Sequence, residues 1–148
     1  MKALLHRWPL LLAALWWGGI SALSFLAVPM LFAFFGNPAV AGPMAAKLFQ
    51  AQSWFSLIAA LALLLWGRSQ RAIEGRAIDM GLLPWLLLAA LAALLQEFGV
   101  AQKILTARSA GADVRLWHSL GSVLVALQWF CALRSLWFLA ARSERSAG

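Results

Sequence analysis

Charged residues are scarce in this chain: Asp, Glu, Lys and Arg together make up 11% of its 148 residues. A soluble domain usually carries about 25%, and one this poor in charge would expose large apolar patches to water. The single cysteine, Cys131, excludes an intramolecular disulfide, and the sequence has no Cys/His spacing typical of a metal site. It also lacks the GxSxG, HExxH, Walker A, GxGxxG and EF-hand patterns, so no residues point to a hydrolase or a kinase.

Apolar residues are abundant instead and make up 64% of the sequence. They gather in four long segments, at roughly residues 8–35, 43–67, 80–100 and 116–141. Each segment has the ~20 residues that an α-helix needs to cross ~30 Å of hydrocarbon. We therefore predict an all-α integral membrane protein, built as an antiparallel, up-and-down four-helix bundle.

The connections between these segments are short, about 7, 12 and 15 residues, and leave no room for a second domain. Residues 1–148 are therefore expected to form a single transmembrane four-helix domain. The net charge of +7 does not indicate nucleic-acid binding, because the basic residues flank the apolar segments, as topology signals do. The expected partners are the lipid bilayer and either a second copy or another membrane protein.

Lysine and arginine are shared unequally between the two ends of the predicted bundle. One end holds Lys2, Arg7, Arg68, Arg71, Arg76, Arg142 and Arg145, and the other holds Lys47, Lys103, Arg108 and Arg115. Cytoplasmic loops carry the excess of basic residues, so both termini and the 68–79 loop are predicted to be cytoplasmic. The same end has the tryptophans Trp8, Trp66, Trp85 and Trp137, which favour the membrane interface. Nine arginines against three lysines are typical of a GC-rich bacterial genome, and we expect a multi-pass bacterial inner-membrane protein.

The first segment follows basic residues, as the apolar region of a signal peptide does. It is far longer than the about 7–15 residues of such a region, so we expect a membrane helix. Pro29 lies well inside this segment and is expected to kink the helix near its outer end. Gly42 and Pro43 predict a break followed by the start of the second helix.

Small residues predict where the helices pack. Lipid tails are as apolar as leucine, so helices associate through close backbone approach and polar contacts. The first helix has Ala14, Gly18 and Ala22 at a spacing of four residues. The third has Ala89 and Ala93, and the fourth has Ser122 and Ala126. These positions are the expected packing ridges.

Polar residues within the apolar segments are the candidate functional residues, because burying them in a membrane is costly. A candidate outer-face polar site comprises Glu97, His118, Gln96, Arg115, Ser119 and Ser122. Its members on the fourth helix follow i, i+3, i+4 and i+7 spacing and share one face. Gln50, Gln52 and Gln128 are further polar residues within the spans, and Arg134 is expected to extend towards the inner headgroups.

Glu97 and His118 are expected near the outer ends of neighbouring antiparallel helices. We expect them to form either a hydrogen-bonded pair that sets the helix register or a site that takes up protons or a ligand. A bis-histidine haem is excluded, because His6 lies at the opposite end of the bundle, ~30 Å away. A haem or a quinone held through His118 alone stays open.

Two regions carry a family resemblance. The first reads Val28-Pro29-Met30-Leu31-Phe32 and, further on, Ala41-Gly42-Pro43, and the second reads Leu116-Trp117-His118-Ser119. In this order they resemble the transmembrane protein 205-like family of small four-helix membrane proteins of unknown function. The matching positions are Gly19, Pro29, Phe32, Ala41, Gly42, Phe49, Arg108 and His118. The resemblance implies the four-helix architecture and no particular reaction.

Three functions remain compatible with the sequence. The favoured one is a non-enzymatic membrane accessory, scaffold or subunit, because the chain has no catalytic constellation and no metal-ligand set. The second is a transporter of small solutes or ions, which would need an oligomer because four helices are few for a transporter. The third is a redox protein that binds haem or a quinone at His118.

Overall fold

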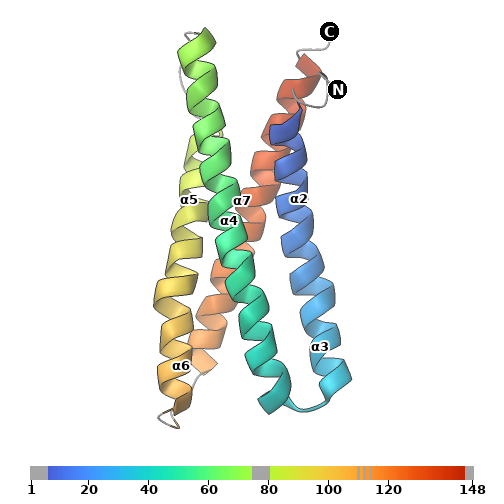
Figure 1. The fold of residues 1–148 in the computed structure, drawn as a ribbon, viewed down its shortest axis with the longest axis vertical. Coiled ribbons are helices and arrows are strands. Elements are labelled where there is room, and N and C mark those ends of the chain that lie inside the picture. Colours follow the sequence, from blue (N-terminus) through green and yellow to red (C-terminus); the bar gives the residue numbers. More distant parts are fainter. Residues whose placement is uncertain (1–6, 75–80, 110, 112, 114, 146–148) are drawn as a thin grey trace.

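The computed structural model describes residues 7–74, 81–109, 111, 113 and 115–145, and all of its regular structure is helical. Four helices are long and apolar enough to cross a membrane, over Trp8–Phe35, Pro38–Gln70, Leu83–Ile104 and Arg115–Ser143. The predicted all-α bundle of four membrane-spanning helices is confirmed (Figure 1). The helices alternate in direction, so α2 begins and α7 ends at the same end of the bundle, which we call the terminal end. The opposite end is called the distal end.

The first span consists of α2 (Trp8–Ala22), a π-turn η1 (Leu23–Ala27) and α3 (Val28–Phe35). Proline has no N–H, so Pro29 cannot donate the α-helical hydrogen bond to the residue four positions before it. The irregular turn lies just before this proline, and the N–H of Val28 reaches back five residues to the carbonyl of Leu23. The helix is therefore disturbed where the sequence predicted a kink, and it is disturbed as a π-turn.

The second span is a single helix, α4 (Pro38–Glu74), and the predicted start at Pro43 is wrong. The side-chain oxygen of Asn37 accepts a hydrogen bond of 2.9 Å from the N–H of Ala39, as a helix cap does. Pro38 occupies the first helical position, where a missing N–H costs nothing. Pro43 is tolerated inside the helix. Its missing N–H leaves the carbonyl of Ala39 without a helical donor, and Ala39 is exposed at the distal end.

The third span consists of α5 (Leu83–Leu94), a second π-turn η2 (Leu95–Ala101) and α6 (Gln102–Ser109). The span ends at Ser109, nine residues beyond its predicted end at 100. The connection to the fourth span is therefore shorter than the predicted 15 residues. The predicted start of the third span at 80 lies outside the described residues. The fourth span is α7 (Arg115–Arg145), and the N–H of Arg115 donates a hydrogen bond of 2.8 Å to a carboxylate oxygen of Asp113.

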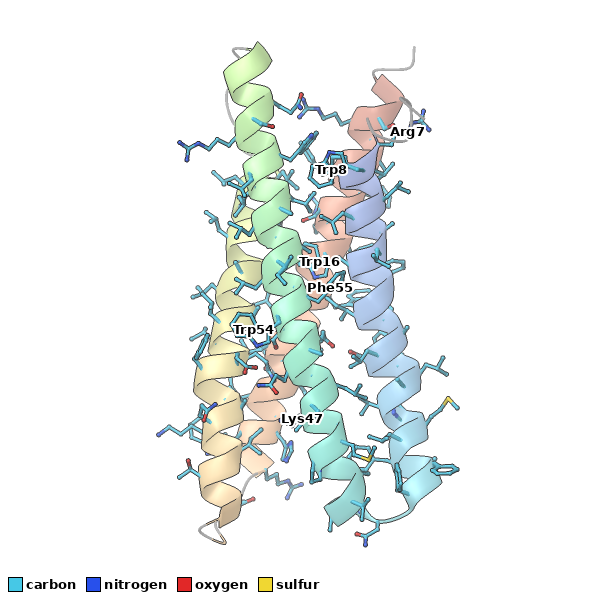
Figure 2. The ribbon with its side chains drawn as sticks, viewed as in Figure 1. Arg7, Trp8, Trp16, Lys47, Trp54 and Phe55 are labelled. Carbon is cyan, nitrogen blue, oxygen red and sulfur yellow. The ribbon has the colours of Figure 1, made fainter. Side chains whose placement is uncertain are left out.

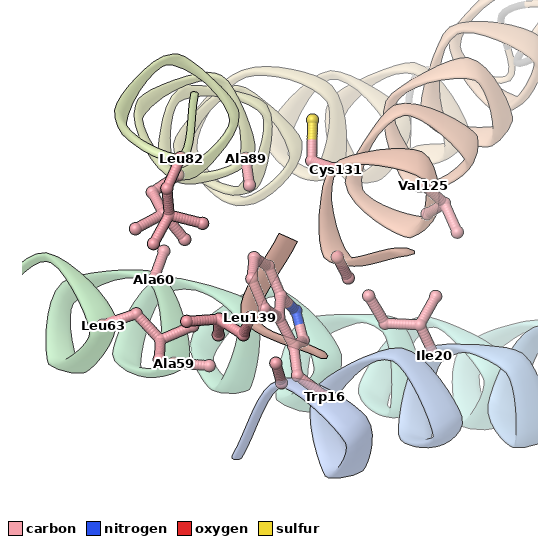
Figure 3. Close-up of a cluster of buried hydrophobic side chains, with 13 residues drawn as sticks. Trp16, Ile20, Ala59, Ala60, Leu63, Leu82, Ala89, Val125, Cys131 and Leu139 are labelled. Carbon is pink, nitrogen blue, oxygen red and sulfur yellow. The ribbon is translucent and has the colours of Figure 1, made fainter. Parts of the chain in front are cut away.

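Each helix packs against two others: α2 contacts α4 and α7, and α5 contacts the same two helices. The central cluster combines small and large side chains from all four spans (Figure 3). Among its small members are Ala13, Ala59, Ala60, Ala89 and Ala132, and among its large members are Trp16, Ile20, Leu63 and Leu86. Small residues let the backbones approach closely, which drives association in lipid.

The packing face of the first helix differs from the predicted one. Ala14 and Ala22 are exposed, and the helix buries Ala13, Trp16 and Ile20 instead. The reason is that α2 is apolar on every side, so its sequence contains more than one stripe of correct spacing. On the other helices the outcome is mixed: Ala89 and Ala93 are buried as predicted, whereas Ser122 and Ala126 are exposed.

Two hydrogen bonds between tryptophan and serine link α2 to its neighbours. The indole N–H of Trp16 donates to the Ser56 hydroxyl on α4 at 3.0 Å, and that of Trp129 on α7 donates to Ser21 at 2.8 Å. Trp16 lies in the middle of the bundle, between α2 and α4 (Figure 2). Such contacts fix the rotation and the register of one helix against another.

Aromatic and basic side chains gather at the terminal end. Arg7 and Trp8 lie there, with Trp8 stacked edge-on against Trp66 (Figure 2). The guanidinium of Arg142 lies 5.6 Å from the centre of the Trp66 ring, and that of Arg134 lies 5.5 Å from the Trp85 ring. These are distances for cation–π contacts. This end therefore has the composition of a membrane interface.

We predict that Trp16→Phe destabilises the bundle by about 1–3 kcal/mol, because it removes the indole donor and leaves the buried Ser56 hydroxyl without its partner. Thermal or denaturant unfolding of the detergent-solubilised protein measures the loss. Trp54→Phe is the matched control, because Trp54 is exposed and its edge-on contact with Phe98 survives in phenylalanine. Equal losses in both variants would contradict a role for the Trp16–Ser56 bond.

Candidate functional site

The candidate outer-face site divides into a buried part and an exposed part. Gln96 and Glu97 lie on η2 and are each 8% exposed. The members on α7 are all exposed, namely Arg115, His118, Ser119 and Ser122. The hydroxyls of Ser119 and Ser122 donate to carbonyls four residues earlier in their own helix, so neither hydroxyl needs a partner outside α7. The structure therefore does not gather the six residues into one pocket.

Glu97 bonds to Gln50 on α4 rather than to His118. The Gln50 Nε2 atom donates to Glu97 Oε1 over 2.7 Å, and no ion pair to Glu97 occurs among the residues that the structure describes. His118 is exposed on the first turn of α7. The π-turn accounts for the difference, because a wider turn rotates its residues away from the regular α-helical phase on which the expected pair rested.

Three glutamines are buried inside the spans: Gln52 on α4, Gln96 on η2 and Gln128 on α7, which are 4%, 8% and 0% exposed. We call them the buried glutamines. Each lies at least 13 residues from both ends of its long helix, about 20 Å at 1.5 Å per residue. The sequence identified these residues as polar positions within the spans but included only Gln96 in the candidate site.

Most amide atoms of the buried glutamines have no hydrogen-bond partner among the described residues. Both polar atoms of Gln52 and of Gln128, and the Oε1 atom of Gln96, are buried without a hydrogen bond. Each unpaired buried group costs about 1–3 kcal/mol in a protein, and lipid offers no compensation. An occupant with hydrogen-bonding groups or charge would remove this cost, so the buried glutamines are the strongest candidate site in the described part of the chain.

Gly121 brings α7 close to η2. A Cβ atom at this position would lie 3.5 Å from Nε2 of Gln96 and 3.4 Å from a methyl carbon of Val100. The Gln96 amide therefore lies against the α7 backbone. Gln128 follows Gly121 by seven residues on the same face, two turns or about 10 Å further towards the terminal end. Polar groups thus follow one another along the inner side of α7.

The positions that carry the family resemblance form no common site. Ala41 is buried near the start of α4, and Phe49 packs partly buried against the central cluster. A Cβ at Gly19 would lie 3.9 Å from the Phe55 ring. Pro29, Phe32 and His118 are exposed, Gly42 is half-buried, and Arg108 lies on α6 with its side chain outside the described part. These positions are spread along the bundle.

No group of three or more His, Cys, Asp or Glu gathers to hold a metal ion within the described ranges. Of the carboxylates whose side chains are described, Asp113 is exposed and Glu97 is buried. The site therefore combines one buried carboxylate with several neutral amides. This arrangement provides oxygen ligands and hydrogen-bond donors, and it lacks the paired groups of acid–base catalysis.

Fold and site together define a membrane protein of four apolar spans with polar groups buried between its helices. Residues 11–113, more than half of the chain, match the domain of unknown function DUF4149. The chain belongs to this family. No match was found among curated proteins or among solved structures.

We predict that Gln50→Leu lowers the stability of the folded protein by about 1–3 kcal/mol, because Glu97 loses its donor while it stays buried. Unfolding in detergent measures the loss. Gln102→Leu is the matched control, because Gln102 is an exposed glutamine on the same span as Glu97. A Gln50→Leu variant as stable as this control would show that the hydrogen bond contributes nothing.

Proposed function

We propose that the chain binds a small polar solute or an ion between its helices and passes it across the membrane, acting as an oligomer of four-helix units. The observation that supports this function is the set of unpaired amides of the buried glutamines. A non-enzymatic accessory role was favoured from the sequence, but it gives no reason to keep these costly groups at membrane depth. Transport of a solute through the bundle gives such a reason, because the solute would bond to these amides.

The accessory or subunit role remains the second candidate, because one feature of the distal end favours it. The helix α3 buries none of its residues, and the α7 face with His118, Ser119 and Ser122 is exposed. A helix of a partner protein or of a second copy would cover these polar groups. Assembly through this end is compatible with transport, which needs an oligomer, and also with a purely structural role.

For location, we propose a single domain in the bacterial inner membrane with both termini in the cytoplasm, and we keep the relationship to the transmembrane protein 205-like family as a separate proposal from the sequence. The supporting observation is the arginine and tryptophan cluster at the terminal end, which has Trp8, Trp66, Arg134 and Arg142. Basic residues favour the cytoplasmic side of a membrane protein.

This orientation predicts the labelling of introduced cysteines. Ser69→Cys lies near the terminal end and Lys103→Cys near the distal end, both at exposed positions. A membrane-impermeant maleimide should label Lys103→Cys in intact spheroplasts and Ser69→Cys after the membrane is opened. The native Cys131 is fully buried and gives the background level. The opposite pattern would reverse the proposed orientation.

If the protein is a transporter, the flux of at least one of Na⁺, K⁺, Cl⁻, urea or glycerol into proteoliposomes should exceed the flux of the same solute into protein-free vesicles. Stopped-flow light scattering and ion-sensitive dyes measure it. Gln128→Leu should lower this flux about tenfold, which corresponds to about 1.4 kcal/mol from one lost hydrogen bond. Its fold should be at least as stable as the wild type, because the variant removes an unpaired buried amide.

Gln102→Leu is again the control and should transport as the wild type does. Chemical crosslinking or mass determination in the same vesicles establishes that oligomers are present. Background flux for every solute in confirmed oligomers would rule out transport of these solutes and leave the subunit role.

A further inference from the structure

We propose that one anionic phospholipid binds to the outside of the bundle where α5 meets α7, with its headgroup phosphate on Arg134. The inference goes beyond the proposed function and does not rest on it, because the residues involved face away from the inside of the bundle. It starts from a guanidinium that is exposed within a membrane span, is held by aromatic rings and has no described counter-charge.

Aromatic rings hold Arg134 in place. Its guanidinium carbon lies 5.5 Å from the centre of the Trp85 ring on α5, a distance for a cation–π contact. The Trp85 ring also lies edge-on to Phe130 on α7, with 5.6 Å between the ring centres, and it packs against the central cluster. Because the core fixes Trp85, the charge of Arg134 is presented at one place, where α5 and α7 are in contact.

The depth of Arg134 suits a headgroup phosphate. Trp85 is the third residue of α5, so the guanidinium beside it is level with the first turn of the third span. Apolar spans begin where the hydrocarbon begins, and lipid headgroups lie just outside it. Arg134 itself is nine residues before the end of its span at Ser143. From such a position the long side chain of an arginine extends towards the headgroups.

The charge of Arg134 has no carboxylate partner in the described part of the chain. Of the carboxylates whose side chains are described, Asp113 lies at the distal end and Glu97 is hydrogen-bonded to α4 from η2. The first turn of α5, which carries Trp85, has no acidic residue. A charge within a span is costly without a partner of opposite sign. The planar guanidinium matches the geometry of a phosphate, which would supply that partner.

An apolar track runs from Arg134 towards the middle of the membrane. Val123, Ala126 and Phe130 precede it on α7 at helical spacing, so they share one face with Arg134, and all are exposed. Val123 is 11 residues away, about 16 Å at 1.5 Å per residue, close to half of the ~30 Å hydrocarbon. Trp137 follows on the same face towards the terminal end and is 68% exposed. An acyl chain lies along this track when the phosphate is on Arg134.

The charge of the terminal end selects an anionic lipid. Arg7, Arg68, Arg134 and Arg142 all lie towards this end, and no carboxylate side chain is described there. A zwitterionic headgroup brings its own cationic group, which these arginines repel. Phosphatidylglycerol brings the phosphate charge alone, and basic residues near a membrane surface attract such lipids.

The test is native mass spectrometry of the full-length protein, purified in detergent and freed of lipid. It is titrated with phosphatidylglycerol or with phosphatidylcholine that has the same acyl chains. We expect the tightest phosphatidylglycerol to bind about fivefold or more tightly than phosphatidylcholine, and to saturate at one per chain. Equal affinities for the two lipids, or no saturable binding, would overturn the assignment.

Arg134→Gln should weaken the tightest phosphatidylglycerol about fivefold and leave phosphatidylcholine unchanged, because it removes one basic group near the membrane surface. Arg68→Gln is the matched control, since it removes the same charge from an exposed arginine of the terminal end, on α4. The control should bind as the wild type does. An unchanged affinity in Arg134→Gln would overturn the site. An equal loss in both variants would also overturn it, because attraction to the total positive charge would then explain the binding.

A second pair of variants tests the apolar track without changing any charge. Ala126→Trp places a bulky ring between Val123 and Phe130 and should weaken phosphatidylglycerol severalfold. Ala14→Trp is its control, because Ala14 is also an exposed alanine, on α2. An unchanged affinity in Ala126→Trp, or an equal loss in Ala14→Trp, would contradict a lipid bound along α7.

A second copy of the chain is the alternative occupant of this face. In that case the lipid-free protein should have the mass of a dimer, Arg134→Gln should have the mass of a monomer, and both should bind phosphatidylglycerol equally well. This result would overturn the lipid assignment.

Discussion

The architecture of this bundle depends on one constraint: inside a membrane, burying leucine does not drive helices together. Association must come from close backbone approach and from polar contacts between helices. The protein uses both, with alanines at the centre and indole-to-serine hydrogen bonds that tie α2 to α4 through Trp16 and to α7 through Trp129. Since each bond links one position on α2 to one position on a neighbour, the two together determine how that helix is rotated. The apolar residues outside this framework face lipid.

The same constraint makes the buried glutamines informative. Where polar groups hold helices together they are paired, as Trp16 and Ser56 are, because an unpaired group in hydrocarbon costs free energy without any return. Gln52 and Gln128 are fully enclosed and hold nothing together by hydrogen bonds among the described residues. Packing alone would accept leucine or methionine at these positions at lower cost. Their presence is therefore better explained by an occupant than by the stability of the bundle.

Composition and segment length were sufficient to predict four membrane helices, because a span of ~20 apolar residues has few other stable states. Helix ends were harder. Pro43 suggested a start, but the cap formed by Asn37 begins α4 five residues earlier. Packing faces were harder still, because α2 is apolar on all sides, and both the ridge of Ala14, Gly18 and Ala22 and the buried face of Ala13, Trp16 and Ile20 follow helical spacing. The contact that selects the face, between Trp16 and Ser56, joins residues 40 positions apart and leaves no local pattern.

The hydrogen-bond partner of Glu97 could not be predicted from the sequence, for a physical reason. Assigning it to His118 assumed regular α-helical rotation, and the π-turn η2 changes that rotation where Gln96 and Glu97 lie. Proline before the first π-turn explains the irregularity of α2 and α3, but η2 contains no proline and has Gly99 as its only special residue. A wide turn without a local cause has poorer hydrogen-bond geometry than the α-helix it replaces, and such turns often occur at functional sites. In this bundle η2 directs Glu97 towards Gln50 on α4 and Gln96 towards Gly121 on α7. The irregular turn is thus the element that carries polar groups to both neighbouring helices at membrane depth, which is a placement that binding requires and that apolar packing does not.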